Sequence, residues 1–227
     1  MANKKESITL STFKKGTLIV KIVGDSDLIL CAKSRSYELA EIFKQSNPKG
    51  TKIPDKYLQA YNLWEKLITA IHWEKPIEFH DDDWSLYSEE EWNRYMTENR
   101  PCILGKAFQD SLKEAFVSCG FKESTGKAGT DFKRTIKFSP MIPINFAQAG
   151  YTQHLAQTSG LNRTNVLTQA NVFNGWSAEL QITYLETAFP KTTILDLVTC
   201  AGDFIGVGSR RGEGYGRYHI DKVSEIS

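Results

Sequence analysis

A chain of 227 residues, 41% of them hydrophobic, is long enough for one well-buried domain with insertions or for two small ones, and gives no sign of disorder. Its net charge of +1 neither indicates nor excludes a basic surface, because local asymmetries cancel in the total. There is no signal-peptide-like apolar run and no stretch of about 18 uncharged apolar residues, so we expect a soluble cytoplasmic protein. The four cysteines form no CxxC pair, which argues against a zinc site or a disulfide framework and favours reduced thiols.

The first third of the chain begins with two apolar, β-branched runs, at residues 17–25 and 28–32, separated by turn-like residues. This pattern predicts an opening hairpin. Residues 37–45 favour a short helix that ends at the turn sequence 47–50. Apolar residues then recur at helical spacing from Pro54 to the His72-Trp73 pair, which predicts a second helix with a buried face.

Residues 78–98 are strongly acidic. Ser88 and Glu91 have the spacing of a capping box, so we expect a helix to start there. His80 stands beside three consecutive aspartates, which raises a metal or acid–base site as one interpretation. Consecutive residues cannot all point at one ion, and we therefore favour a solvated acidic loop and predict no metal site and no cofactor.

The middle of the chain combines one clear helix with a basic region. Residues 106–119 form an amphipathic pattern that ends at Gly120. Residues 131–139 alternate as a strand, whereas residues 140–160 are small, polar and aperiodic. With the strand-like run 166–173, this excursion predicts a projecting hairpin.

Two further elements precede the most informative stretch. Residues 176–185 alternate cleanly as a strand, and Thr193 is expected to cap a helix that runs to Phe204. A glycine-rich stretch at 206–220 follows at once, and residues 215–221 within it alternate like a final strand.

This stretch carries five glycines and three arginines. Glycine tolerates positive φ and lets another backbone approach closely, so we expect a sharply bent loop whose amides point outward. Arginine side chains match phosphate geometry. A dinucleotide fingerprint would follow a strand and open a helix, and the order here is reversed. A tight turn with solvated arginines is the plain alternative. The residues concerned are Gly206, Gly208, Arg210, Arg211, Gly212, Gly214, Gly216 and Arg217.

Without its insertions the chain reads strand, helix, strand, strand, helix, loop, strand, which is the split βαβ order. The predicted fold is therefore α+β, a ferredoxin-like (RRM-like) core with a helical insertion and a projecting β-hairpin. We expect a single domain over 1–227, with a helical and acidic insertion at about 34–100 and a hairpin or loop excursion at about 138–172. The open face of such a sheet is a common platform for single-stranded RNA.

The helix followed by GVGSRRGEGYGRYHI resembles the C-terminal signature of the RAMP superfamily, the repeat-associated RNA-binding subunits of CRISPR effector complexes. Gly206, Gly208, Gly212, Gly214, Gly216 and Arg217 match the signature. Residues 100–116 are similar to the entry into the first helix of these proteins, although the usual Pro-Gly-Ser run is absent and leaves the subfamily open. Residues 176–184 and 201–208 also resemble stand-alone relatives carried by phages and mobile elements. The resemblance covers the C-terminal half and implies a ferredoxin-like domain whose glycine-rich loop contacts RNA.

The hypothesis that we favour is a protein that binds RNA or another single-stranded nucleic acid. The glycine-rich loop would hold phosphates, and basic side chains on the hairpin would extend the track. The resemblance also implies self-assembly along RNA as a homo-oligomer or filament, or as a subunit of a ribonucleoprotein complex, with the acidic segment docking on a neighbour. The additional residues are Lys106, Lys133, Arg134, Lys137 and Arg163.

Two alternatives belong to other functional classes. One is a metal-independent processing endoribonuclease of the same superfamily, for which His219 is a weak candidate catalytic residue. The other is a phage protein that inhibits a host CRISPR or other defence complex by mimicking one of its subunits, with the acidic segment imitating nucleic acid. Either would act in a bacterial cytoplasm, which is a phage's host cell in the second case.

Overall fold

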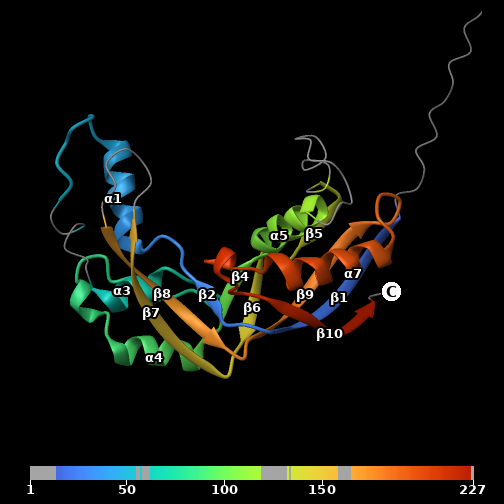
Figure 1. Ribbon diagram of the computed structural model, residues 1–227. Coiled ribbons are helices and arrows are strands. Elements are labelled where there is room, and N and C mark those ends of the chain that lie inside the picture. Colours follow the sequence, from blue (N-terminus) through green and yellow to red (C-terminus); the bar gives the residue numbers. More distant parts are fainter. Residues whose placement is uncertain are drawn as a thin grey trace, which may run out of the picture.

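The fold is α+β and is built on two antiparallel sheets (Figure 1). The computed structural model describes residues 14–54, 57, 62–118, 132, 134–157 and 165–225. The predicted fold class is thereby confirmed. No helix within these residues has the length and apolar character needed to cross a membrane.

The larger sheet is centred on β1 (Lys15–Gly24), which pairs with β10 (Tyr218–Glu225) on one side and β9 (Ser177–Leu185) on the other. The far edge of β9 is shared by two short strands, β5 (Ile136–Phe138) and β6 (Met141–Asn145). The strand order β10-β1-β9-β5 is consistent with the split βαβ arrangement expected from the sequence.

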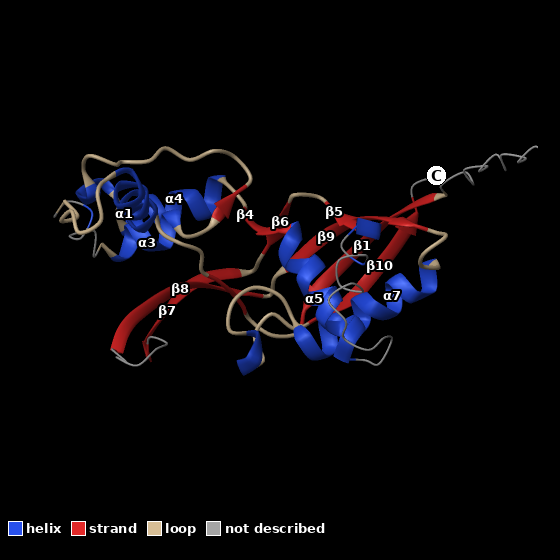
Figure 2. Cartoon of the chain, turned by 90° about the horizontal axis from the view of Figure 1, so that it is seen from above, coloured by secondary structure: helices blue, strands red, loops and turns tan. Residues whose placement is uncertain are grey.

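Two helices, α5 (Gly105–Ser118) and α7 (Lys191–Cys200), lie on one face of this sheet (Figures 1 and 2). Buried residues of β1 and β9 alternate with partly or fully exposed ones along most of each strand, as a sheet with one covered face requires. Their buried members pack against apolar residues of the two helices and form the main core. This core includes Leu18, Val20, Ile22, Leu180, Ile182, Phe108, Leu112, Ile194, Leu197 and Val198.

Beyond β6 the larger sheet continues through β4 (Pro101–Leu104) to β3 (His72–Trp73). The second sheet consists of β2 (Leu28–Leu30), β8 (Asn165–Asn174) and β7 (Gln148–Gln157). Strands β7 and β8 form the projecting hairpin, which extends away from the larger sheet (Figure 2).

Helices α1 (Arg35–Ser46), α3 (Leu63–Thr69) and α4 (Glu89–Glu98) lie beside this hairpin (Figure 1). The predicted cap at Ser88 is confirmed, since its hydroxyl accepts a hydrogen bond from the Glu91 amide at 3.2 Å. A 3₁₀ turn at Trp84–Leu86 precedes α4. A second, smaller core holds α3, the 3₁₀ turn and α4 together and consists of Leu67, Ile68, Tyr87 and Trp92.

Asn171 of β8 ties the helical insertion to the hairpin. Its buried Oδ1 accepts a hydrogen bond from Trp92 Nε1 at 2.9 Å, and its Nδ2 donates to the Leu67 carbonyl at 2.8 Å. Replacing Asn171 by alanine leaves two buried polar groups unpaired, so we expect a loss of about 2–3 kcal/mol in the free energy of unfolding. Denaturant unfolding measures this loss. Asn145→Ala, an exposed asparagine on β6, is the matched control, and equal midpoints for both variants would contradict the prediction.

The predicted opening hairpin is wrong, because β2 pairs with β8 and not with β1. Both edges of β1 are already occupied by β9 and β10. The backbone after β1 is also held elsewhere: the Gly24 amide donates to the Trp176 carbonyl at 2.8 Å, and the Asp25 amide to the Arg217 carbonyl at 2.9 Å.

Two helix boundaries also differ from the prediction. Within the helix expected over 54–73, Tyr57 is helical and residues 55, 56 and 58–61 lie outside the described residues. Helix α3 begins at Leu63, where Asn62 Oδ1 caps it by accepting from the Trp64 amide, and His72–Trp73 pairs with β4 as a strand. The last helix begins at Lys191 after Pro190, and not at Thr193. The Pro190 carbonyl accepts the first helical hydrogen bond, from the Ile194 amide at 3.3 Å.

The strand predicted at 131–139 is reduced to Ile136–Phe138, because residues 134 and 135 are helical and β6 takes the rest of the β9 edge. The last strand begins at Tyr218 and not at residue 215.

Cys31 and Cys102 are free thiols. Cys200 is disulfide-bonded, so the expectation of reduced thiols is wrong for this residue.

Candidate nucleic-acid interface

The glycine-rich segment, residues 206–217, connects a π-helical turn (Ala201–Ile205) to β10 and is hydrogen-bonded to β2 and to the connection between β1 and β2. The Gly216 amide donates to the Asp27 carbonyl and the Ser209 amide to the Ile29 carbonyl, each at 2.8 Å. The Val207 amide closes the segment on itself by donating to the Gly216 carbonyl at 3.0 Å. The segment therefore has a fixed shape set by backbone hydrogen bonds.

Four of its five glycines, at 206, 208, 214 and 216, have positive φ. Gly216 is the most constrained, with φ of 71° and a position at which a Cβ atom would lie 1.9 Å from the Val207 oxygen. At Gly208 the same atom would lie 2.6 Å from the Ile29 oxygen. Gly212 has no such requirement, since nothing lies within 4 Å of its Cβ position. Most of the glycines thus serve the fold of the loop.

The expectation that the loop amides point outward is wrong for part of the segment. The amides of residues 206, 207, 209, 213, 214, 216 and 217 donate to acceptors within the protein. Within the part of the chain that the structure describes, the amides of Gly208, Arg210, Arg211, Gly212 and Tyr215 have no acceptor. The donors available to an anion are therefore concentrated at the apex of the segment, residues 208–212.

Arg210 and Arg211 extend from this apex and pair with exposed carboxylates. Arg210 Nε donates to Glu213 at 2.8 Å, and its guanidinium lies 5.3 Å from the ring centroid of Tyr215. The hydrogen bond from Arg210 lowers the pKa of Glu213. Arg211 Nη1 lies 3.2 Å from Glu114 of α5. The two arginine side chains are 24% and 33% exposed, and their partners are more exposed, so solvent screening leaves these pairs easy to exchange for a phosphate.

Arg217 has a different role. Its amide donates to the Ser26 hydroxyl at 2.9 Å and its carbonyl accepts from Asp25, so its backbone anchors the segment. Its Nη1 atom is buried and has no hydrogen-bond partner among the described residues. A buried cationic donor without an acceptor is costly, and an anionic ligand would relieve that cost.

The other predicted basic residues lie on different elements. Lys106 pairs with Asp110 of its own helix at 3.2 Å. Lys137 lies on β5 opposite Thr183, and exposed Arg134 precedes that strand, so neither is on the hairpin as expected. Lys133 and Arg163 lie outside the described residues.

His219, the weak catalytic candidate, lies on β10 with its Nδ1 2.6 Å from Asp25 Oδ1. Both side chains are exposed. The pair lacks the burial that strengthens electrostatic interactions in catalytic sites.

Most carboxylates of the acidic segment are exposed, but three of them make side-chain contacts. His80 Nε2 lies 2.9 Å from Glu91, and Arg35 donates three hydrogen bonds to Asp81, the shortest at 2.6 Å. Asp83 accepts from Ser85 at the start of the 3₁₀ turn. Across the described ranges, no group of three or more histidine, cysteine or acidic residues is arranged to hold a metal ion.

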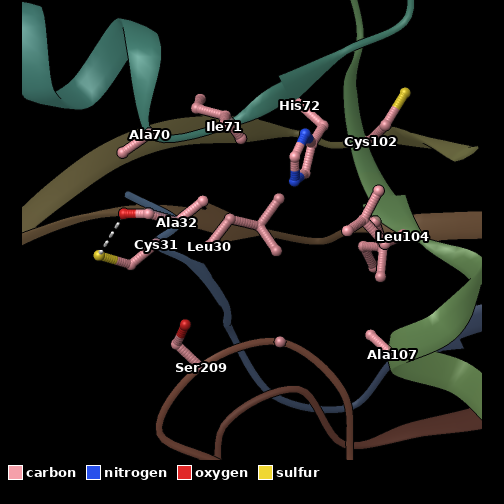
Figure 3. A pocket seen from close by; sticks show the side chains of 12 residues that line it. Leu30, Cys31, Ala32, Ala70, Ile71, His72, Cys102, Leu104, Ala107 and Ser209 are labelled. Carbon is pink, nitrogen blue, oxygen red and sulfur yellow. Dashed lines mark hydrogen bonds between the residues drawn. The ribbon is translucent and has the colours of Figure 1, made fainter. Parts of the chain in front are cut away.

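A small pocket lies against the apex of the glycine-rich segment, and we call it the junction pocket. Its volume is about 230 Å³. In Figure 3 the His72 imidazole points into it from β3, and Ser209 of the segment lies on the opposite side. Its wall comes from residues 30–32, 70–72, 102–104, 107, 208 and 209.

The junction pocket has a mostly apolar wall. Burial raises the pKa of the Cys31 thiol, and burial raises that of Cys102 to about 11, so both stay neutral at pH 7. Sequence reasoning missed this pocket, because its wall comes from four segments far apart in the chain. The only signal was the apolar run 28–32, which was interpreted as a strand.

Comparison with known proteins gives little at the level of sequence. No family model matches the chain, and no curated protein matches it. Among solved structures, the chain is similar to one from the cryo-EM structure of the Type III-B Cmr-beta bound to cognate target RNA. The sequence identity is 11% and the TM-score is 0.49, over 94% of this chain and 61% of that one. The protein therefore spans less than two thirds of the length of that chain.

Proposed function

We propose that this protein binds single-stranded nucleic acid, and RNA in particular, at the apex of the glycine-rich segment. The observation that carries the proposal is the combination found there: unpaired backbone amides and two exchangeable arginines beside an apolar pocket. Amides and guanidinium groups bind phosphate oxygens, and an apolar pocket takes an unstacked base. The resemblance of this segment to the RAMP signature favours RNA over DNA.

Phosphate would be held by the amides of residues 208 and 210–212, with Arg210 and Arg211 released from their carboxylates. Both of those carboxylates are more than half exposed, so they remain hydrated after release. The base attached to the same phosphate would reach the junction pocket, whose wall includes Gly208 and Ser209. One nucleotide thus engages both parts of the site.

Self-assembly along RNA, as a subunit of a ribonucleoprotein filament, is a further part of this proposal. Glu89 and Glu90 of α4 are among the exposed carboxylates of the acidic segment that a neighbouring subunit would meet. Size-exclusion chromatography with and without RNA tests this part, and a single monomeric peak under both conditions would refute it.

Fluorescence anisotropy of a labelled single-stranded RNA at low salt tests the proposed function. We expect binding by the wild type and a loss of roughly tenfold or more in affinity for the double variant Arg210→Ala/Arg211→Ala. Lys222→Ala, an exposed lysine on β10, is the control and should bind as the wild type does. A single-stranded DNA of the same sequence, titrated in the same way, shows whether the protein prefers RNA to DNA. If the processing-nuclease alternative is wrong, the RNA stays intact on a denaturing gel after incubation with the protein. Equal affinity for wild type and double variant would overturn the proposal.

A further inference from the structure

A second and larger pocket lies between α1 and the hairpin, and we call it the α1 pocket. Its volume is about 600 Å³, within the range that holds small organic ligands. It shares Cys31 and Ala32 with the junction pocket, so the two lie on either side of the connection between β2 and α1. Its other wall comes from Leu167 and Gln169 of β8.

The α1 pocket is electropositive. Lys33, Lys44 and Lys66 are among its wall residues, and Glu41 is the one acidic side chain among the described residues that form it. Lys44 forms an ion pair with Glu41, with 2.7 Å between Lys44 Nζ and Glu41 Oε1. No carboxylate of the described residues lies within 4 Å of Lys33 or Lys66, and both ammonium groups are therefore available to an anion.

Aromatic side chains lie next to these lysines. Tyr37 of α1 is 48% exposed, and the ammonium of Lys33 lies 5.0 Å from its ring centroid. Tyr57 is also part of the wall. A tyrosine face with a cation beside it is the arrangement that binds a stacked base and its phosphate.

A buried hydrogen-bond network holds the start of α1, which contributes Ser36 to the pocket wall. Glu65, fully buried, accepts hydrogen bonds from the Ser36 amide at 2.9 Å, from the Ser36 hydroxyl and from Thr69. Burial raises its pKa, and these donors oppose that shift. These hydrogen bonds to Glu65 hold Ser36 and the start of α1 in one position. The pocket is therefore expected to be formed before any ligand binds.

We propose that the α1 pocket binds one nucleotide unit, with its base against Tyr37 and its phosphate between Lys33 and Lys66. The nucleotide can be part of the RNA strand held at the adjacent junction pocket, and in that case the inference rests on the proposed function. Alternatively, the pocket binds a free nucleoside monophosphate, which carries the same base and phosphate groups. Neither the RAMP resemblance nor the glycine-rich segment includes these residues.

The test uses the full chain and the double variant Lys33→Ala/Lys66→Ala, with Lys222→Ala as the matched control. AMP and UMP are titrated by calorimetry, and labelled RNA is titrated by anisotropy. We expect the double variant to lose RNA affinity by about tenfold, which identifies the strand as the source. A loss of AMP or UMP binding with unchanged RNA affinity would instead identify the free nucleotide. No effect of the double variant on either ligand would overturn the proposal.

Tyr37→Leu is a second variant, which keeps an apolar side chain at an exposed position and so preserves folding. It should weaken the same ligand, because stacking is lost. Failure of this inference is distinguishable from failure of the proposed function. If Arg210→Ala/Arg211→Ala leaves RNA binding intact while Lys33→Ala/Lys66→Ala reduces it, RNA binds at the α1 pocket and does not contact the glycine-rich segment.

Discussion

Alanine at Gly216 is expected to destabilise the protein by about 3 kcal/mol or more, and to abolish RNA binding with it. Gly216 has φ of 71°, and a Cβ atom there would lie 1.9 Å from the Val207 oxygen and 3.0 Å from the Val207 nitrogen. A methyl group cannot be accommodated unless the hydrogen bonds from Val207 to Gly216 and from Gly216 to Asp27 break. Positive φ adds a further cost of about 1 kcal/mol for a non-glycine residue.

Gly212→Ala is the matched control for this variant. Gly212 lies in the same segment, its φ is not positive, and its Cβ position has nothing within 4 Å. We expect thermal and denaturant unfolding of Gly212→Ala to match the wild type, while Gly216→Ala unfolds at much lower denaturant concentration. If both glycines tolerate alanine equally, the backbone hydrogen bonds do not fix the shape of the segment.

The second large effect is expected at Trp176, which precedes β9. Its side chain is fully buried, its ring lies 6.1 Å from that of Tyr218, and its Nε1 donates to the Ser26 carbonyl at 2.8 Å. Trp176→Ala removes a large side chain from the main core and also a contact to the β1–β2 connection that anchors the glycine-rich segment. We expect a loss of about 3–5 kcal/mol in the free energy of unfolding.

Two further variants separate the contributions at Trp176. Trp176→Phe keeps most of the packing and loses the hydrogen bond, so a smaller loss of about 1–2 kcal/mol is expected from denaturant unfolding. Phe204→Ala, at a side chain that is 68% exposed, should be close to neutral. Losses of equal size for Trp176→Ala and Phe204→Ala would show that Trp176 does not hold the core together.

The helices and strands that could be predicted from the sequence are those in which apolar residues recur at regular spacing. The alternation in β9 and the apolar face of α5 were clear, and they gave the α+β class. The partner of β2 was not predictable in the same way, because a short apolar run has no preference for one neighbour. Its pairing with β8 depends on both edges of β1 being taken by strands that come much later in the chain.

The candidate site was predicted in part. The glycine pattern located the segment, but it did not show that most loop amides are used inside the protein or that Arg211 pairs with Glu114 of α5. Those partners come from residues distant in sequence. The two pockets were missed for the same reason, since Lys33 and Lys66 belong to segments that the fold alone brings together.

The salt dependence of RNA binding is the most direct test of the claim that the apex of the glycine-rich segment contacts phosphate. For a single strand, the logarithm of the binding constant falls with the logarithm of salt concentration by about 0.7 for each phosphate neutralised. The account predicts a slope for Arg210→Ala/Arg211→Ala that is shallower than that of the wild type by about 1.4, and an unchanged slope for Lys222→Ala. The same slope for the wild type and the double variant would contradict it.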